Sequence, residues 1–190
     1  MFALVLLLAI LAVLVAYGVM VYNGLVSVKH AVAKAWANID VLLKQRHDEI
    51  PKLVEVCRRY RNFEQRTLEN VVRARSAVHA AREKRDIAAL GAAEQVLRGS
   101  LGSLFAVAEA YPDLKTNESF LKLQARISDL ENGIADRREV YNEAVNVNNV
   151  RIEQFPDVVI AKMFDFPPAR LLQFSAAEKA DVDMRALFAA

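Results

Sequence analysis

The stretch that decides the fold is FALVLLLAILAVLVAYGVMVY, residues 2–22, in which no side chain is charged. A helix needs about 20 apolar residues to cross a hydrocarbon core about 30 Å thick, and this run is long enough. A cleaved signal peptide has a cationic start and a shorter apolar core, whereas this chain opens with Met-Phe-Ala. A buried core helix is rarely apolar on every face over such a length. We therefore predict an uncleaved transmembrane anchor from Phe2 to Tyr22, within a first segment of residues 1–24.

The charges that flank the anchor predict its orientation. Lys29 and Lys34 follow the apolar run, and the N-terminal side offers only the α-amino group. The positive-inside rule favours an N-terminus outside the cell membrane and the rest of the chain in the cytoplasm, with a periplasmic location as the alternative. Cys57 is the only cysteine and forms no internal disulfide, which fits a reducing compartment without excluding an oxidising one.

The residues after the anchor read as an all-α domain. Alanine is abundant, and glycine and proline number only 6 and 5 in the whole chain. The net charge of +2 is spread along the chain, so the sequence gives no electrostatic case for nucleic acid.

Apolar residues recur every three or four positions in four consecutive stretches, which places each set on one helical face. The stripes consist of Leu25, Val28, Val32, Ala35, Ile39 and Leu42; Leu53, Val56, Tyr60, Phe63, Val71, Ala74 and Val78; Leu90, Leu97, Leu101, Leu104 and Ala108; and Phe120, Leu123, Ile127, Leu130, Ile134, Tyr141, Ala144, Ile152 and Phe155. With short connections between them, the stripes predict an elongated antiparallel up-and-down four-helix bundle over residues 25–156.

The breaks between stripes carry recognisable signals. No proline separates the anchor from the first stripe, so we predict one continuous helix from the membrane to about Arg46. Asp48 and Pro51 fit the start of a second helix, because proline is tolerated in a first turn. Asp86 fits the N-cap of the third helix, and Pro156 ends the fourth.

A short apolar segment, residues 157–175, follows the bundle at the end that we expect near the membrane. Its candidate interfacial residues are Val158, Val159, Met163, Phe164 and Phe166. They fit a short amphipathic segment in the membrane interface, or alternatively a cover for the open end of the bundle. Residues 176–190 are predicted to be disordered.

Several ordered motifs resemble the LemA family of bacterial membrane proteins. The motifs are Tyr22-Asn23-Gly24-Leu25-Val26, Ala35-Trp36-Ala37-Asn38-Ile39-Asp40-Val41, Arg46-His47-Asp48-Glu49-Ile50-Pro51-Lys52-Leu53-Val54-Glu55, Ala108-Glu109-Ala110-Tyr111-Pro112-Asp113-Leu114-Lys115, Glu131-Asn132, Arg137, Tyr141-Asn142 and Phe155-Pro156. The resemblance covers about residues 20–170 and implies a single-pass anchor and an antiparallel helical bundle. One departure is Phe63-Glu64, where the family often has His-Glu. The resemblance supplies no reaction, and it implies a role in envelope or organelle-membrane organisation.

The histidine and cysteine residues, which often act in active sites and metal sites, do not form a recognisable catalytic or metal-binding motif. His30, His47 and His79 form no helical zinc motif, and Cys57 has no partner cysteine. The inward-facing Glu-x-x-His pairs of a carboxylate-bridged metal bundle do not occur. We therefore predict no catalytic residue, no metal site and no cofactor.

Two polar features stand out. Arg137 and Glu94 occupy apolar-register positions, and because a buried unpaired charge is costly we predict that Arg137 pairs with Glu94 or with Glu69. The second feature, a candidate interaction site at the tip, comprises Tyr111, Pro112, Asp113, Leu114 and Lys115; alternatively, Tyr111 only packs locally.

These observations predict a noncatalytic, membrane-anchored helical bundle that scaffolds protein interactions or organises the membrane or envelope. Small residues on the first helix (Ala31, Ala33 and Ala37) add the prospect of self-assembly into a homo-oligomer. The alternative is a regulatory or signalling input module for a partner enzyme or protease. The sequence names no protein partner.

Overall fold

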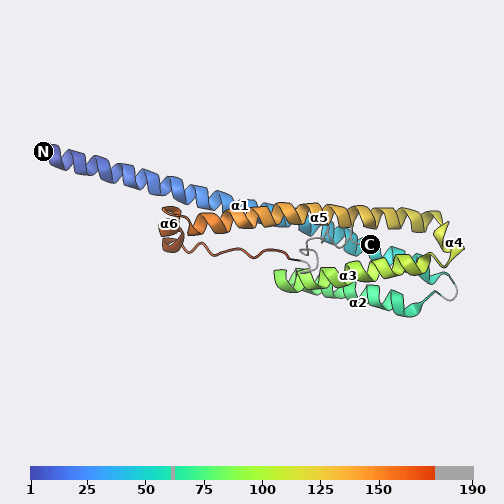
Figure 1. Ribbon diagram of the computed structural model, residues 1–190. Helices are drawn as coiled ribbons and strands as arrows, with labels where there is room; N and C mark the ends of the chain where they lie inside the picture. Colours follow the sequence, from blue (N-terminus) through green and yellow to red (C-terminus); the bar gives the residue numbers. More distant parts are fainter. Residues whose placement is uncertain (61–62, 174–190) are drawn as a thin grey trace, which may run out of the picture. The chain divides into compact units, whose positions relative to one another are not determined.

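The computed structural model describes residues 1–60 and 63–173, and no strand occurs among them. Its helices are α1 (Phe2–Arg58), α2 (Gln65–Glu83), α3 (Ile87–Ala108), α4 (Pro112–Lys115), α5 (Glu118–Glu153) and α6 (Asp157–Met163) (Figure 1). The all-α fold with a long apolar N-terminal helix is confirmed. The predicted disordered tail, residues 176–190, lies outside the described residues, as do the last two residues of the 157–175 segment.

Helix α1 is continuous from the apolar stretch well beyond the predicted end at Arg46. It runs through Pro51 and ends at Arg58, so the predicted turn at Asp48–Pro51 is wrong. Proline inside a helix removes one backbone hydrogen bond, which would normally leave the carbonyl of residue i−4 without a donor. Here that carbonyl belongs to His47, and it accepts a hydrogen bond from Arg75 Nε at 2.9 Å. The lost backbone donor is thus replaced by a side chain from α2.

The chain forms two compact units, each of which contains parts of α1 and α5. Unit 1 comprises residues 1–43 and 131–171, and unit 2 comprises residues 44–130 together with the described residues 172 and 173. These units do not follow the boundaries inferred from the sequence (1–24, 25–156, 157–175 and 176–190), which remain a prediction.

In unit 1, the first part of α1 packs against the second part of α5. Trp36 meets Tyr141 with ring centroids 5.8 Å apart, and a Cβ on Gly133 would lie 3.3 Å from Leu42 Cδ1. Positions further along α1 therefore meet positions earlier in α5, which makes the two helices antiparallel, as Figure 1 shows. A small core of Val21, Leu25, Ile152 and Ala161 joins this pair to α6.

The chain that follows α6 is extended and is held by side chains of α5. Asn149 donates to the carbonyl of Ala169 at 3.0 Å and accepts from its backbone N–H at 2.8 Å. The hydroxyl of Tyr141 donates to the carbonyl of Arg170 at 2.9 Å. These bonds satisfy backbone groups that no helix or sheet satisfies.

Unit 2 contains the end of α1, the α2–α3 hairpin, α4 and the start of α5. Asp86 caps α3, because its side chain accepts from the backbone N–H of Ala89 at 3.1 Å, as predicted. The buried stripe of α1 in this unit includes Ile50 and Leu53, both 0% exposed. Unit 2 also includes Gln173, whose carbonyl oxygen occupies the place of a Cβ on Gly91, so only glycine fits at this position of α3.

Candidate functional site

A buried ion pair lies in the core of unit 2. Arg46 of α1 binds Glu94 of α3, and the two side chains are 1% and 4% exposed. Glu94 is therefore buried with a cationic partner, but that partner is not the predicted one. Arg137 is exposed and belongs to unit 1, and the alternative, Glu69, is exposed on α2 and accepts from Gln65. The reason is the register of α1, in which Arg46 falls between the buried Leu43 and Ile50.

Next to this pair, Arg75 of α2 binds the turn of α1 in which Pro51 cannot donate a backbone hydrogen bond. Besides its bond to the carbonyl of His47, Arg75 Nη2 lies 2.6 Å from His47 Nε2. A guanidinium only donates, so Nε2 accepts and the neutral ring carries its proton on Nδ1. That Nδ1 is buried without a hydrogen-bond partner among the described residues.

The surroundings of His47 oppose its protonation. Burial lowers the pKa of His47, and the nearby charges of Arg75 and His79 lower this pKa further. The two imidazole rings lie 4.6 Å apart. Burial and the Arg75 guanidinium thus favour the neutral form of the His47 imidazole, because both lower its pKa.

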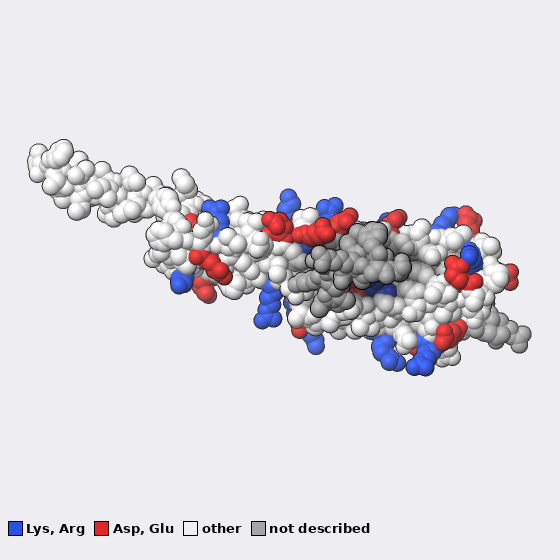
Figure 2. Space-filling view, in the orientation of Figure 1, with Lys and Arg blue, Asp and Glu red and all other residues white. Residues whose placement is uncertain are grey.

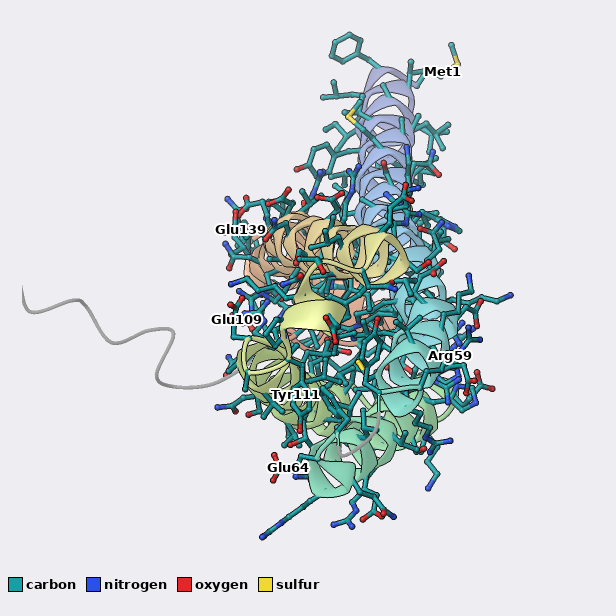
Figure 3. All side chains as sticks on the ribbon, turned by 90° about the vertical axis from the view of Figure 1, so that its right-hand side faces the viewer. Met1, Arg59, Glu64, Glu109, Tyr111 and Glu139 are labelled. Carbon is teal, nitrogen blue, oxygen red and sulfur yellow. The ribbon has the colours of Figure 1, made fainter. Side chains whose placement is uncertain are left out.

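The predicted tip site forms a short helix, α4, rather than an open loop. Leu114 is fully buried, and Tyr111 is half-buried against Phe63 at a centroid distance of 5.1 Å. Tyr60 donates to the carbonyl of Asp113 at 3.2 Å, so the α1–α2 connection lies beside α4. Figure 3 shows this end of unit 2. Tyr111 and Leu114 pack locally, which leaves an exposed tip surface of Pro112, Asp113 and Lys115.

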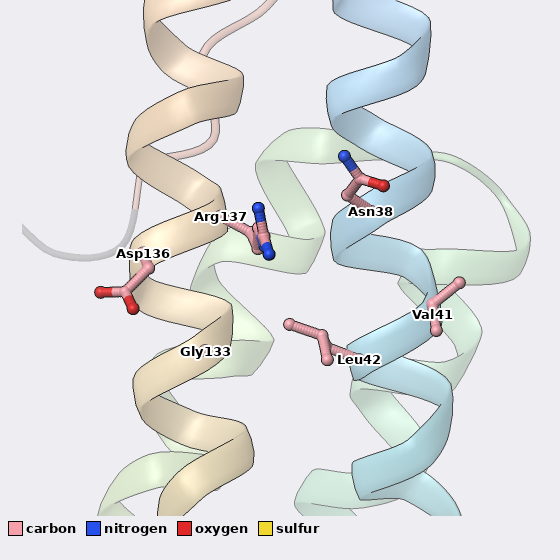
Figure 4. Close-up of a pocket in the computed structure, with 6 residues that line it drawn as sticks. All are labelled: Asn38, Val41, Leu42, Gly133, Asp136 and Arg137. Atoms are coloured by element: carbon pink, nitrogen blue, oxygen red, sulfur yellow. The ribbon is translucent and has the colours of Figure 1, made fainter.

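A hollow of about 550 Å³ lies between α1 and α5 in unit 1. Its lining residues are Asn38, Val41, Leu42, Gly133, Asp136 and Arg137. Figure 4 shows Arg137 and Leu42 pointing into the space between the helices, whereas Asp136 points away. The hollow is shallow, and its polar groups do not include a nucleophile with an adjacent base.

The candidate interfacial segment divides into two faces. Ala161 is buried, and Ile160 and Phe166 pack against the same core as α1. Val159, Met163 and Phe164 are 51%, 68% and 54% exposed. Val158 is half-buried. One side of α6 therefore covers the end of the α1–α5 pair, and the other side faces outward.

In residues 1–60 and 63–173, no group of three or more His, Cys, Asp or Glu side chains is placed to hold a metal ion. Cys57 is fully buried, and burial raises its pKa to about 12, so its thiol is not a nucleophile at neutral pH.

The sequence of the chain matches the LemA family over residues 35–185. The chain belongs to the LemA family. It is 28% identical to Protein LemA of Metamycoplasma hominis over 162 residues, which is 85% of this chain and 73% of the relative. It is also 32% identical to the magnetosome proteins MamQ 1 and MamQ 2 of Paramagnetospirillum magneticum over 74 residues, 39% of this chain and 27% of each relative.

Sequence reasoning missed Arg46 and Arg75. Arg46 was detectable in principle, because it continues the three-and-four spacing of Ile39, Leu43, Ile50 and Leu53. Arg75 gave no such signal. Its role depends on Pro51, which lies 24 residues earlier and whose helical location the sequence did not reveal.

Proposed function

We propose that this LemA-family protein is a noncatalytic single-pass membrane protein that scaffolds protein interactions or organises a membrane. The observation that carries the proposal is the continuity of α1. Its apolar part is long and apolar enough to cross a membrane by length and composition, and the same helix continues without a break into the packed cores of both units. Such a helix holds folded protein at a fixed distance from the bilayer.

The surface of the protein supports the same proposal. Figure 2 shows the apolar part of α1 without charged side chains, while acidic and basic side chains lie interspersed over the rest of this face. Ala31, Ala33 and Ala37 are exposed on α1, and small residues let a second helix approach closely, which supports self-assembly. We favour a cytoplasmic location for both units, since Lys29 and Lys34 follow the apolar part.

Photo-crosslinking in native membranes tests the proposal. A photoreactive residue at Lys115 probes the tip surface, one at Ala33 probes the small-residue face, and one at Glu139 serves as an exposed control on α5. We expect position-dependent adducts, with a second copy at position 33 and with a noncatalytic protein at position 115. A partner that is an enzyme or protease, whose activity changes when the adduct forms, would support the regulatory alternative instead.

A uniform absence of adducts at positions 33 and 115 would overturn the scaffold proposal. The variant Leu114→Ala is unsuitable for this test, because Leu114 is fully buried and its truncation would destabilise unit 2. Asp113→Ala changes only an exposed side chain and leaves position 115 for the photoreactive residue, and we expect it to weaken the adducts of the tip surface without loss of helicity.

A further inference from the structure

The outward side of α6 exposes several large apolar residues on a short segment. Val159 and Met163, four positions apart, lie on one side of the helix at 51% and 68% exposure. Phe155, just before α6, is 79% exposed, and Phe164, just after it, is 54% exposed. We call these four residues the α6 face. Isolated exposed apolar residues are ordinary, but a contiguous group marks an interaction site.

The contacts of α6 fix its position along α1. A Cβ on Gly18 would lie 3.9 Å from Ile160 Cδ1, and the ring of Tyr22 lies 4.9 Å from the ring of Phe164. Val21 and Leu25 share a buried core with Ala161. In unit 1, α6 therefore packs against the last turn of the apolar stretch itself, as Figure 1 shows.

The apolar stretch of α1 includes the residues against which α6 packs. Residues 2–22 form about 31 Å of helix at 1.5 Å per residue, which matches a hydrocarbon core of about 30 Å. The first charged side chain after this stretch is Lys29. A normal span by α1 consequently places Gly18 and Tyr22, and α6 with them, at the boundary between hydrocarbon and headgroups.

The exposed apolar surface is continuous from α1 to α6. Val19, Met20 and Tyr22 are 55%, 69% and 37% exposed, and Tyr22 contacts Phe164 directly. Lys162 is exposed within α6, and Lys29 lies 5.7 Å from the ring centroid of Phe166. Apolar side chains with neighbouring lysines are the composition of a segment that lies in the membrane interface.

We infer that the α6 face inserts into the interface of the same membrane that α1 spans, as a second, shallow contact with lipid. The opposite side of α6 covers the core of unit 1, so one helix fills both roles. The inference rests on the proposed membrane anchorage, and it predicts a protein whose α1–α5 pair is held at two points rather than one.

Fluorescence of a single thiol-linked dye in reconstituted vesicles tests the inference. Cys57 is buried and its pKa is raised to about 12, so a new exposed cysteine reacts selectively with a maleimide. The full chain carries an environment-sensitive dye at Met163→Cys, at Ala12→Cys in the apolar stretch, or at Val41→Cys, a 55% exposed position of α1, as the matched control. Position 41 lies 19 residues beyond Tyr22, or about 28 Å along the helix.

With phosphatidylcholine–phosphatidylglycerol vesicles, we expect the dye at position 163 to be blue-shifted and several-fold more quenched by shallow nitroxide lipids than the dye at position 41. Position 12 should respond to deep nitroxide lipids. Emission and quenching at position 163 equal to those at position 41, with position 12 still quenched, would overturn the inference alone. Loss of quenching at position 12 would instead overturn the anchorage. A blue shift at 163 that depends on the protein-to-lipid ratio and is insensitive to nitroxide would show a second copy on the α6 face and would also overturn the inference.

Discussion

Helix α1 passes through two environments, and the contrast between its ends explains most of the molecule. Over residues 2–20 its large apolar side chains are exposed on every face. Over residues 43–57 the apolar side chains Leu43, Ile50, Leu53 and Cys57 are at most 2% exposed, and Arg46 is buried among them. The first region carries no charge and needs an apolar solvent from outside the protein. The second supplies its own apolar surroundings and therefore must pair the charge that it buries.

The largest expected effect comes from breaking that pair. Glu94→Gln removes the negative charge opposite the buried Arg46, and we expect a loss of about 3–5 kcal/mol in the free energy of unfolding. Urea unfolding of the full chain in detergent, followed by circular dichroism at 222 nm, measures this loss.

Two comparison variants sharpen the measurement. Glu118 pairs with Lys122 at 2.6 Å but is 82% exposed, so we expect Glu118→Gln to cost about 0–1 kcal/mol. Replacing both buried partners, Arg46→Met with Glu94→Leu, should recover most of the stability, because no charge is left unpaired. A double variant as unstable as Glu94→Gln would contradict this account of the pair.

The next effect tests the other end of α1. Val13 and Val41 are both exposed on the helix, at 68% and 55%, but only Val13 lies in the apolar stretch. An arginine near the centre of a membrane span costs about 3 kcal/mol, which corresponds to roughly a hundredfold shift in insertion. We expect Val13→Arg to reduce the carbonate-resistant membrane fraction strongly, and Val41→Arg to leave it unchanged. Equal behaviour of the two variants would contradict the assignment of residues 2–22 to the membrane.

The same contrast shows what the sequence could predict. Uniform apolarity and the three-and-four spacing predicted the all-α fold and the buried face of α3, because both signals are local. The second stripe was predicted as one helix, but it is divided between the end of α1 and α2. The end of α1 was missed because Pro51 is a local breaker whose cost is offset by Arg75, a residue of another helix. The partner of Glu94 was missed for a related reason, since the first helix was predicted to end at about Arg46, and this residue was therefore not considered as a core cation. Leu114 was expected in an interaction site at the tip, whereas it is fully buried within unit 2.

A smaller effect tests the helix turn at Pro51. Arg75→Met keeps the apolar stem but removes the donor to the carbonyl of His47, and we expect a loss of about 1.5–3 kcal/mol. Pro51→Ala restores a backbone N–H that competes for this carbonyl, so Arg75→Met should cost less in the Pro51→Ala background. Arg73→Met is the matched control, because Arg73 is exposed on the same helix. Equal costs of Arg75→Met in both backgrounds would show that Arg75 acts independently of the proline.

The smallest expected effect is a pH dependence of the folded protein's stability, which arises from His47 in the same turn of α1. The pKa of His47 is lowered in the folded protein, mainly by burial and further by Arg75 and His79, so the unfolded chain binds a proton more readily. The contribution of the neutral ring to stability is complete above the unfolded pKa of about 6.5 and is lost as the pH falls toward the lower folded pKa. Between pH 7.5 and 5, thermal unfolding in detergent should therefore show a decrease in Tm for the native chain. His47→Gln keeps an acceptor for Arg75 but does not titrate, so its Tm should fall less over the same range. An identical fall in both proteins would mean that other groups produce the pH dependence and that His47 is not held neutral by the surroundings that the structure shows.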